Sequence, residues 1–282
     1  MTSAPDGKVL LITGATGKQG GSAIDALLAS PRASEFSILG VTRSTDSPSA
    51  QKLAAKSPLI KLIQGDFADV PAMFRAASDA AAGRPVWGVF SVQVPSGKGQ
   101  SPETEERYGK TMVDEARRQG VAQFVYASVD RGGEPRSWDN PTDIPHFASK
   151  HNIELHLRAS TRGTAMGWTI LRPVAFMDNF APGFGTKVFG AALQARLGEK
   201  PLQFVAVRDI GRAAARAFLE PDAYRGKAVG LAGAELTFRQ LSDAFEQATG
   251  DPLRPTFGFL GSAFLWAVPE MAKMMSWFAV SA

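Results

Sequence analysis

Residues 8–21 read KVLLITGATGKQGG, and this segment decides the fold. Its first six residues are mostly apolar and several are β-branched, which is typical of a buried strand. The glycines after them permit a tight turn, and the pattern over residues 18–29 predicts a helix. A strand, a glycine-rich turn and a helix in this order predict the first unit of a parallel α/β sheet.

The glycines of this turn are spaced G-x-x-G-x-x-G rather than in the more common G-x-G-x-x-G pattern. A helix N-terminus presents unpaired N–H groups and the positive end of the helix dipole, and glycine lets a phosphate approach the backbone. The turn therefore predicts a site for the pyrophosphate of a dinucleotide, the alternative being a structural turn that binds nothing. The residues expected at the pyrophosphate are Gly14, Thr16, Gly17, Lys18, Gln19 and Gly20.

The composition is that of a folded protein. The chain has 282 residues, 44% of them hydrophobic, which is enough to bury a core as one large domain or as one domain with a small lobe. It has no cysteine, which excludes disulfides, a thiolate nucleophile and zinc–thiolate clusters. Residues 1–7 show no basic leader followed by an apolar stretch, so we expect an intracellular, cytoplasmic protein, with the nucleus as an alternative.

The charge pattern gives no sign of a nucleic-acid-binding surface. The net charge is +4, but Lys and Arg are scattered along the chain, as on a solvated surface, so direct binding of nucleic acid is not expected. No His, Asp and Glu cluster has metal-ligand spacing, so we expect no metal. The apolar stretch 259–282 is interrupted by Pro269, Glu270 and Lys273, which predicts a core or interface helix and no membrane span.

Strand-like and helical patterns alternate along the first part of the chain. This alternation predicts a doubly wound α/β fold, in which a parallel sheet has helices on both faces. We expect strands at residues 8–13, 37–42, 60–63, 86–92, 123–127 and 169–171, and helices at 18–29, 70–82, 103–119 and 146–159.

The amino-acid composition changes after residue 175, where Gly and Pro become frequent. We therefore expect a Rossmann domain at residues 1–175 and a smaller C-terminal α/β lobe at 176–282. The lobe is expected to contain a strand near 227–231 and a helix at 237–249, which Thr237 begins as N-cap and Gly250 ends. The strand 202–207 and the helix 209–219 belong either to the lobe or to the first domain. Ligands of open α/β sheets bind beyond the carboxyl ends of the strands, so the lobe should close over that edge.

Residues after the second, third and fourth expected strands bear on cofactor choice. NAD enzymes usually carry an acid after the second strand, where it accepts hydrogen bonds from the ribose, but this chain has Arg43. An arginine attracts a 2′-phosphate, so we expect NADP(H) to be preferred over NAD(H), unless Arg43 is merely solvated. Asp66 and Phe67 are placed to bound the adenine, although Asp66 could equally cap the helix that begins near Val70. Gln93 follows the fourth strand, near where the ribose and pyrophosphate cross the sheet.

Further segments resemble the NmrA-like family of atypical short-chain dehydrogenases. They occur in the family's order from residue 8 to about residue 250, and they are the glycine turn and residues 41–43, 65–66, 88–93, 124–130, 146–150 and 171–179. The resemblance implies a Rossmann domain that binds NADP(H), in a protein that is either a reductase or a sensor of the cofactor's redox state. Members usually continue well past residues 274–278, so we expect the outer part of the lobe to be shortened. The substrate side would then be open, or covered by a partner or a second copy of the chain.

The proton-donor motif of short-chain dehydrogenases is incomplete here. That motif, Tyr-x-x-x-Lys, places both side chains on one face of a helix, where the ammonium lowers the pKa of the phenol. This chain has Lys150 in the lysine position and His146 in the tyrosine position. Lys150 is expected to hydrogen-bond the nicotinamide ribose, the alternative being a surface lysine on an amphipathic helix. His146 either acts as a general acid or packs at the first turn of the helix, and Ser128 either polarises a substrate carbonyl or closes a turn.

Three residues after the sixth strand complete the expected site. Arg172, Phe176 and Asn179 are expected on the substrate side, with a buried structural role as the alternative for Arg172. The sequence thus predicts an NADPH-dependent oxidoreductase acting on a small organic carbonyl, enone, quinone or imine. The alternative is a non-catalytic NADPH/NADP⁺ sensor that regulates a protein partner, which the missing tyrosine favours.

Overall fold

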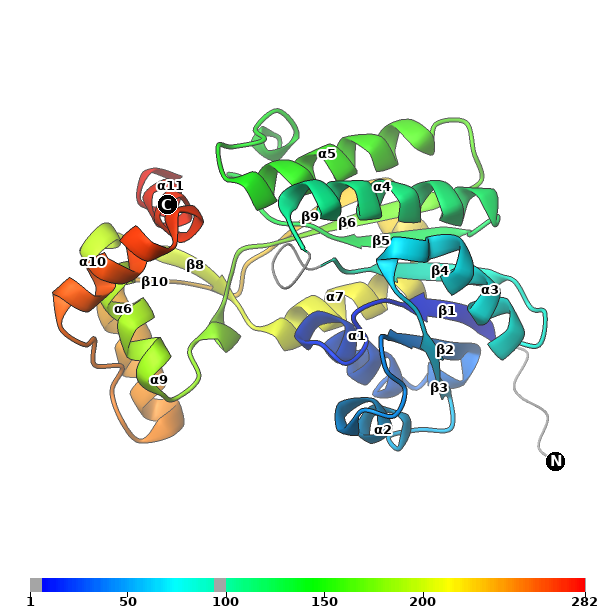
Figure 1. Cartoon of the computed structure of the whole chain (residues 1–282), viewed down its shortest axis with the longest axis horizontal. Coiled ribbons are helices and arrows are strands. Elements are labelled where there is room, and N and C mark those ends of the chain that lie inside the picture. The colour runs from blue at the N-terminus through cyan, green and yellow to red at the C-terminus, as the bar shows by residue number, and fades with distance from the viewer. Residues whose placement is uncertain (1–6, 94–99, 282) are drawn as a thin grey trace.

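A seven-stranded parallel sheet forms the centre of the molecule, and it confirms the expected doubly wound arrangement (Figure 1). The computed structural model describes residues 7–93 and 100–281. The strand order is β3-β2-β1-β4-β5-β6-β9. The strands are β1 (Lys8–Ile12), β2 (Phe36–Thr42), β3 (Ile60–Gln64), β4 (Val86–Ser91), β5 (Gln123–Ala127), β6 (Gly167–Pro173) and β9 (Lys227–Leu231).

Helices cover both faces of this sheet (Figure 1). One face carries α1 (Lys18–Leu28), α2 (Pro48–Ala54) and α7 (Val207–Leu219), and the other carries α3 (Val70–Ala80), α4 (Pro102–Arg118) and α5 (Pro145–Ser160). Side chains of β1 alternate between the two hydrophobic clusters: Leu10 and Ile12 pack on the first face, and Val9 and Leu11 on the second. A strand buried on both faces needs apolar residues throughout, which explains why β1 reads as an unbroken apolar run.

A smaller lobe lies beyond the carboxyl ends of the strands (Figure 1). Its three-stranded sheet has the order β10-β8-β7, with β7 (Ala175–Phe176) parallel and β10 (Ala234–Leu236) antiparallel to β8 (Leu202–Val205). Its helices are α6 (Phe184–Leu197), α9 (Phe238–Thr249), α10 (Gly258–Ala267) and α11 (Pro269–Ser281). The short helices elsewhere are α8 (Pro221–Tyr224) and the 3₁₀ turns Ala33–Glu35, Phe67–Asp69, Arg136–Trp138 and Met177–Asn179.

The chain crosses from the lobe back to the large sheet, which corrects one expectation. Residues 227–231 were expected in the lobe, but they form β9, which pairs in parallel with β6. Helix α7 also returns and packs against α1, whereas β8 stays in the lobe. The edge of β6 offers unpaired backbone groups that β9 satisfies, and this pairing partner is remote in sequence. The lobe is therefore built from two separate chain segments.

The residues that cap a helix can be predicted from sequence when the cap and the groups it bonds are close in the chain. Thr237 caps α9 through Gln240, and Gly250 ends the helix in the left-handed conformation, as expected. The cap of α3 differs from the expectation. Asp69 caps α3 by accepting a hydrogen bond from the N–H of Ala72, whereas Asp66 caps the preceding 3₁₀ turn. Two acidic residues near one helix start compete for the same role, and only the backbone path decides between them.

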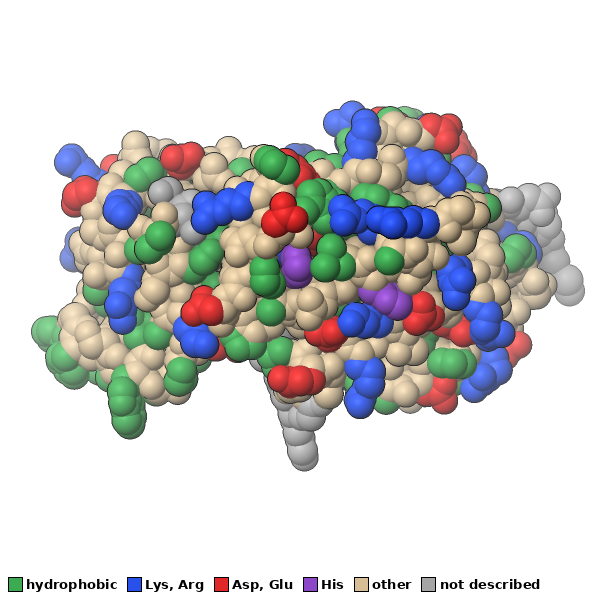
Figure 2. All heavy atoms as spheres, turned by 90° about the horizontal axis from the view of Figure 1, so that it is seen from above, with side chains coloured by type: hydrophobic (Ala, Val, Ile, Leu, Met, Phe, Trp, Pro, Cys, Tyr) green, Lys and Arg blue, Asp and Glu red, His purple; other side chains and the backbone are tan. Residues whose placement is uncertain are grey.

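The apolar stretch lies, over residues 259–281, in the two helices α10 and α11, and Pro269 is the first residue of α11. Across residues 7–93 and 100–281, no helix has the length and apolar character needed to cross a membrane. On the face shown in Figure 2, basic and acidic side chains are interspersed rather than gathered into one large patch.

Candidate functional site

The glycine turn between β1 and α1 is shaped to receive an anion. Gly14 has φ +59°, and its carbonyl accepts a hydrogen bond from the N–H of Gly17 at 2.9 Å. A Cβ on Gly20 would lie 2.3 Å from the oxygen of Gly14, so a side chain there would force the backbone apart. No side chain caps α1, and its first turn has no acidic residue. The free N–H groups of this helix end fit a negatively charged group such as pyrophosphate.

The polar residues of this turn take different positions. Thr16 and Lys18 are exposed, while Gln19 is half-buried and its Oε1 is a buried atom without a hydrogen-bond partner. Lys18 Nζ donates to the carbonyl of Asp178 at 2.7 Å and lies 3.4 Å from Oδ1 of Asn179. Lys18 was expected at the pyrophosphate, and in this structure its ammonium connects the turn to the lobe.

The residues after β2 and β3 lie side by side, because Thr42 pairs with Gln64 in the sheet. Arg43 is exposed, and its backbone carbonyl accepts a hydrogen bond from Gln64 Nε2 at 3.2 Å. Asp66 is also exposed. Phe67 stacks on Tyr108 of α4 with ring centroids 6.2 Å apart. The carboxyl edge of the sheet therefore presents a cation, a carboxylate and an aromatic pair in a row beside the glycine turn.

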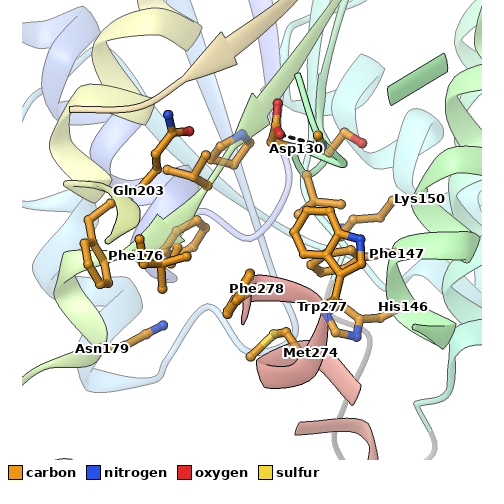
Figure 3. A pocket seen from close by; sticks show the side chains of 18 of the residues that line it. Asp130, His146, Phe147, Lys150, Phe176, Asn179, Gln203, Met274, Trp277 and Phe278 are labelled. Atoms are coloured by element: carbon orange, nitrogen blue, oxygen red, sulfur yellow. Dashed lines mark hydrogen bonds between the residues drawn. The ribbon is translucent and has the colours of Figure 1, made fainter. Parts of the chain in front are cut away.

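A cavity of about 510 Å³ lies between the carboxyl ends of the strands and the lobe (Figure 3). Its wall on the lobe side is largely aromatic and comes from Phe176, Phe180, Phe189, Phe204, Trp277 and Phe278. Several of the residues expected to form the site meet in it: Gln19, Gln93, Ser128, His146, Lys150, Phe176 and Asn179. Gln93 is held by a hydrogen bond from its Nε2 to Oγ of Ser91 at 2.6 Å. The structure thus joins the end of the glycine turn to Lys150 in one space.

Lys150 reaches the cavity from α5 with its ammonium already paired. Its Nζ lies 2.8 Å from Oε1 of Glu105, a fully buried residue in the first turn of α4, and donates to the carbonyl of Ala127 at 3.4 Å. The other oxygen of Glu105 accepts a hydrogen bond from Ser149 at 2.5 Å. The sequence does not single out Glu105, since nothing local distinguishes it from the other acidic residues at the start of α4.

His146 lies at the first turn of α5, on the side of the cavity formed by α11 (Figure 3). Its Nδ1 is 2.6 Å from Oε1 of Glu270, and its backbone N–H donates to the same oxygen at 3.1 Å. The neighbouring Phe147 packs edge-on against Trp277 with ring centroids 5.5 Å apart. Glu270 and Trp277 belong to the apolar C-terminal stretch, which sequence reasoning assigned only to a core or an interface.

Ser128 faces the cavity but its hydroxyl is committed to a buried charge cluster. The hydroxyl donates to Glu154, which also pairs with Arg131 and Arg172 at 2.7 Å each. Burial opposes ionisation of Glu154, but the hydrogen bonds from Arg172 and Arg131 outweigh it and lower the pKa of this carboxyl. The carboxylate is therefore retained inside the protein because both of its oxygens are paired.

Of the two roles expected for Arg172, the structure shows the buried structural one and not the substrate contact. Its side chain is almost fully buried, does not line the cavity, and pairs with Glu154 and Glu134 while lying over the ring of Trp138. A second buried group nearby is the phenol of Tyr126, and its burial raises its pKa well above the usual value. Tyr126 does not line the cavity and so does not replace the missing tyrosine.

Chemically, the cavity combines the ammonium of Lys150, the imidazole of His146, the hydroxyl of Ser128 and the carboxyl groups of Asp130 and Glu235 with an aromatic wall. It suits a ligand with an apolar body and more than one polar group, because polar side chains line it on both the sheet side and the lobe side. No group of three or more His, Asp or Glu residues that could hold a metal ion occurs among the residues that the structure describes.

Solved structures with the same fold include a triphenylmethane reductase and a quinone oxidoreductase. The Citrobacter triphenylmethane reductase complexed with NADP(H) superposes with a TM-score of 0.70 at 20% identity, covering 97% of this chain and 90% of that one. The Escherichia coli quinone oxidoreductase QOR2 complexed with NADPH gives a TM-score of 0.67 at 20% identity, covering 97% and 89%. At this level of identity the likeness establishes the fold.

Curated relatives point to one family. The NmrA-like family domain-containing oxidoreductase hkm9 of Aspergillus hancockii is 28% identical over 88% of this chain and 74% of its own length. FrzB of Cladobotryum, described in the same words, is 26% identical over 96% of this chain and 83% of its own length. The model of the NmrA-like family matches residues 6–279, nearly the full chain, and the chain therefore belongs to the NmrA-like family.

Proposed function

We propose that this chain is an oxidoreductase that uses a nicotinamide dinucleotide, prefers NADP(H) over NAD(H), and acts on a small organic carbonyl, enone, quinone or imine. One observation carries the proposal: a single cavity connects Gln19, at the end of the glycine turn, with Lys150 and an aromatic wall. Support comes from relatives described as oxidoreductases and from the neighbours whose crystals held NADP(H) and NADPH.

The residues that would hold the cofactor follow the carboxyl edge of the sheet. The glycine turn and the N-terminus of α1 would bind the pyrophosphate, with Thr16, Lys18 and Gln19 around it. Arg43 would bind the 2′-phosphate. The adenine would lie near Asp66 and Phe67, and the ribose next to the nicotinamide would lie near Gln93 and Lys150. When bound, NADPH supplies a hydride to the substrate.

The chain's own residues would position the substrate and deliver a proton. Lys150 holds a positive charge at the cavity and would stabilise negative charge on a reduced oxygen. Since Nδ1 of His146 is bound to Glu270, Nε2 is the ring nitrogen left for a proton transfer. The Ser128 hydroxyl already donates to Glu154, so towards the cavity it would serve as a hydrogen-bond acceptor. Phe176 and Asn179 would contact the substrate.

The test follows NADPH absorbance with a panel of quinones, enones, ketones and imines. We expect turnover of at least one class by the wild type. Turnover should be lost in Lys150→Ala and reduced in His146→Ala. Lys110→Ala is a suitable control because this lysine lies on the neighbouring helix and pairs with Glu106 at 2.5 Å, away from the cavity. Tight NADPH binding without turnover of any substrate would contradict the enzyme proposal.

A second candidate function is a cofactor sensor that regulates a protein partner. The contacts of Lys18 with Asp178 and Asn179 favour it, because they join the cofactor turn directly to the lobe. Occupation of the turn by NADPH or NADP⁺ would compete for the ammonium of Lys18 and change how the lobe is held. Limited proteolysis with each cofactor tests this function: different cleavage rates in the lobe support it, and identical rates contradict it.

A further inference from the structure

We propose that Glu105 is a positioning residue, whose buried carboxylate fixes the ammonium of Lys150 at the cavity and thereby sets the affinity for NADP(H). The inference rests on the proposed function, in which Lys150 contacts the nicotinamide ribose. Glu105 itself does not line the cavity and would not touch the ligand. Its effect would pass entirely through Lys150.

The pairing of the two residues is almost fully enclosed. Glu105 is 0% exposed and the side chain of Lys150 is 11% exposed, with 2.8 Å between the carboxylate and the ammonium. Consecutive residues of α5 contact the two oxygens of Glu105: Ser149 donates a hydrogen bond to one, and Lys150 forms the ion pair with the other. A buried carboxylate is retained only when it is paired in this way.

Close packing of α4 and α5 brings the partners together. Gly109, one turn after Glu105, faces Ile153, one turn after Ser149, and a Cβ on Gly109 would lie 2.4 Å from Cδ1 of Ile153. The absence of a side chain at Gly109 lets the two helices approach closely at this level. The start of α4 is fixed by a capping box in which Ser101 and Thr104 exchange hydrogen bonds. The carboxylate is therefore held by a rigid helix end.

The contacts with Glu105 and Ala127 fix the side chain of Lys150 before a ligand binds. A lysine ammonium has three N–H donors; that of Lys150 donates to the carbonyl of Ala127 and is held in an ion pair with Glu105, so donors are left for a ligand. Lysine loses considerable rotamer freedom when it is fixed, and a side chain fixed in advance spares the ligand that cost. An ion pair with a purely structural role would affect the stability of the protein, whereas a positioning residue also affects the affinity for the ligand.

The test compares Glu105→Gln with Glu106→Gln. Glu106 is a matched control, because it lies next on the same helix, pairs with Lys110 at 2.5 Å and accepts a hydrogen bond from Asn152 of α5 at 2.8 Å, but does not contact Lys150. NADPH affinity is measured by quenching of tryptophan fluorescence, and unfolding by urea is measured in parallel. We expect NADPH to bind roughly tenfold more weakly to Glu105→Gln, a loss of about 1.4 kcal/mol, and within about twofold of wild type to Glu106→Gln.

The same comparison in a Lys150→Met background separates positioning from structure. If Glu105 acts through Lys150, adding Glu105→Gln to Lys150→Met causes no further loss of affinity. The double variant has no unpaired buried charge, so we expect it to fold more readily than either single variant. Should Glu105→Gln alone fail to fold, Ser149→Ala removes one partner of the carboxylate without changing a charge. Ser149→Ala is expected to weaken NADPH binding roughly threefold in the wild-type protein. Added to the Lys150→Met variant, it is expected to cause no further loss of affinity.

Each outcome has one meaning. A wild-type protein that binds neither NADPH nor NADH contradicts the proposed function. A wild type that binds NADPH, with Glu105→Gln no weaker than Glu106→Gln, overturns the role of Glu105 alone. Equal losses from Glu105→Gln with and without Lys150 also overturn it, because the carboxylate would then act by another route.

Discussion

Oε1 of Glu270 accepts two hydrogen bonds from His146, one from the ring Nδ1 at 2.6 Å and one from the backbone N–H at 3.1 Å. Glu270 belongs to α11 in the lobe, and His146 to the first turn of α5 in the first domain. No side chain at the N-cap position of α5 bonds its free N–H groups, because Ile144 occupies that position. The lobe therefore provides the cap for a helix of the other domain, and the same contact closes one side of the cavity.

The first prediction concerns this cap. Glu270→Ala removes both hydrogen bonds and should lower the free energy of unfolding by about 1 kcal/mol, whereas His146→Ala keeps the backbone bond and should lower it by less. Urea unfolding of both variants measures the difference. Glu246→Ala, an exposed position on α9, controls for loss of a surface carboxylate. A larger loss in His146→Ala than in Glu270→Ala would contradict the role of Glu270 as a cap.

The second prediction concerns the glycine turn. Gly20→Ala places a Cβ 2.3 Å from the carbonyl oxygen of Gly14, so we expect it to lower the free energy of unfolding by about 1–3 kcal/mol and to weaken cofactor binding. Gly21→Ala is the matched control one residue later. Its Cβ would lie 3.3 Å from the oxygen of Ala15, and alanine stabilises a helix by up to about 1 kcal/mol over glycine. Equal effects of the two substitutions, measured by urea unfolding, would contradict the steric explanation.

The third prediction tests the choice of cofactor. Arg43→Ala should weaken NADPH binding roughly 10- to 100-fold and leave NADH binding within about twofold, because a hydrogen bond to a charged group contributes about 1.5–3 kcal/mol. Titration calorimetry with each cofactor measures both affinities. Arg239→Ala removes an exposed arginine of α9 and controls for the general loss of positive charge. Equal losses for the two cofactors from Arg43→Ala would refute the assignment to the 2′-phosphate.

The fourth prediction follows from the charge cluster beneath Ser128. Glu154→Gln leaves Arg131 and Arg172 without their shared carboxylate and should lower the free energy of unfolding at pH 7 by about 3–5 kcal/mol. The pKa of Glu154 is lower in the folded than in the unfolded protein, so its contribution is present above the unfolded value of about 4.3. It is lost as the pH falls through the folded-state value. Urea unfolding from pH 7 to pH 3 should therefore show wild type and variant converging in acid, and parallel curves would contradict this origin.

Much of the fold is predictable because its signals are local or periodic. Strands buried on both faces must be apolar throughout, which made β1 and the strands beside it readable as continuous runs. The ends of α9 were predicted from Thr237 and Gly250, since capping involves only neighbouring backbone groups. Strand β9 was assigned to the wrong sheet because its partner β6 lies more than fifty residues earlier, and its own residues do not specify a partner.

The site was predictable in part. Seven expected residues line one cavity because the carboxyl ends of parallel strands meet at one edge of the sheet. The sequence left open whether Arg172 contacts substrate or is buried, because the position of its partner Glu154 on α5 cannot be read from the strand that carries the arginine. Trp277 and Phe278 were not identified as cavity residues, because their pattern fits any buried helix.

The sequence by itself determined the parallel sheet and the turn from residue 14 to residue 20, because both depend on steric and hydrogen-bonding rules that act within a few residues. Only the tertiary structure decided which charges meet. Glu105 reaches Lys150, and Glu270 reaches His146, across distances in the chain that no local pattern spans. The physical reason is that contacts between side chains of different helices form where the packing of whole helices places them, and that packing is a property of the complete fold.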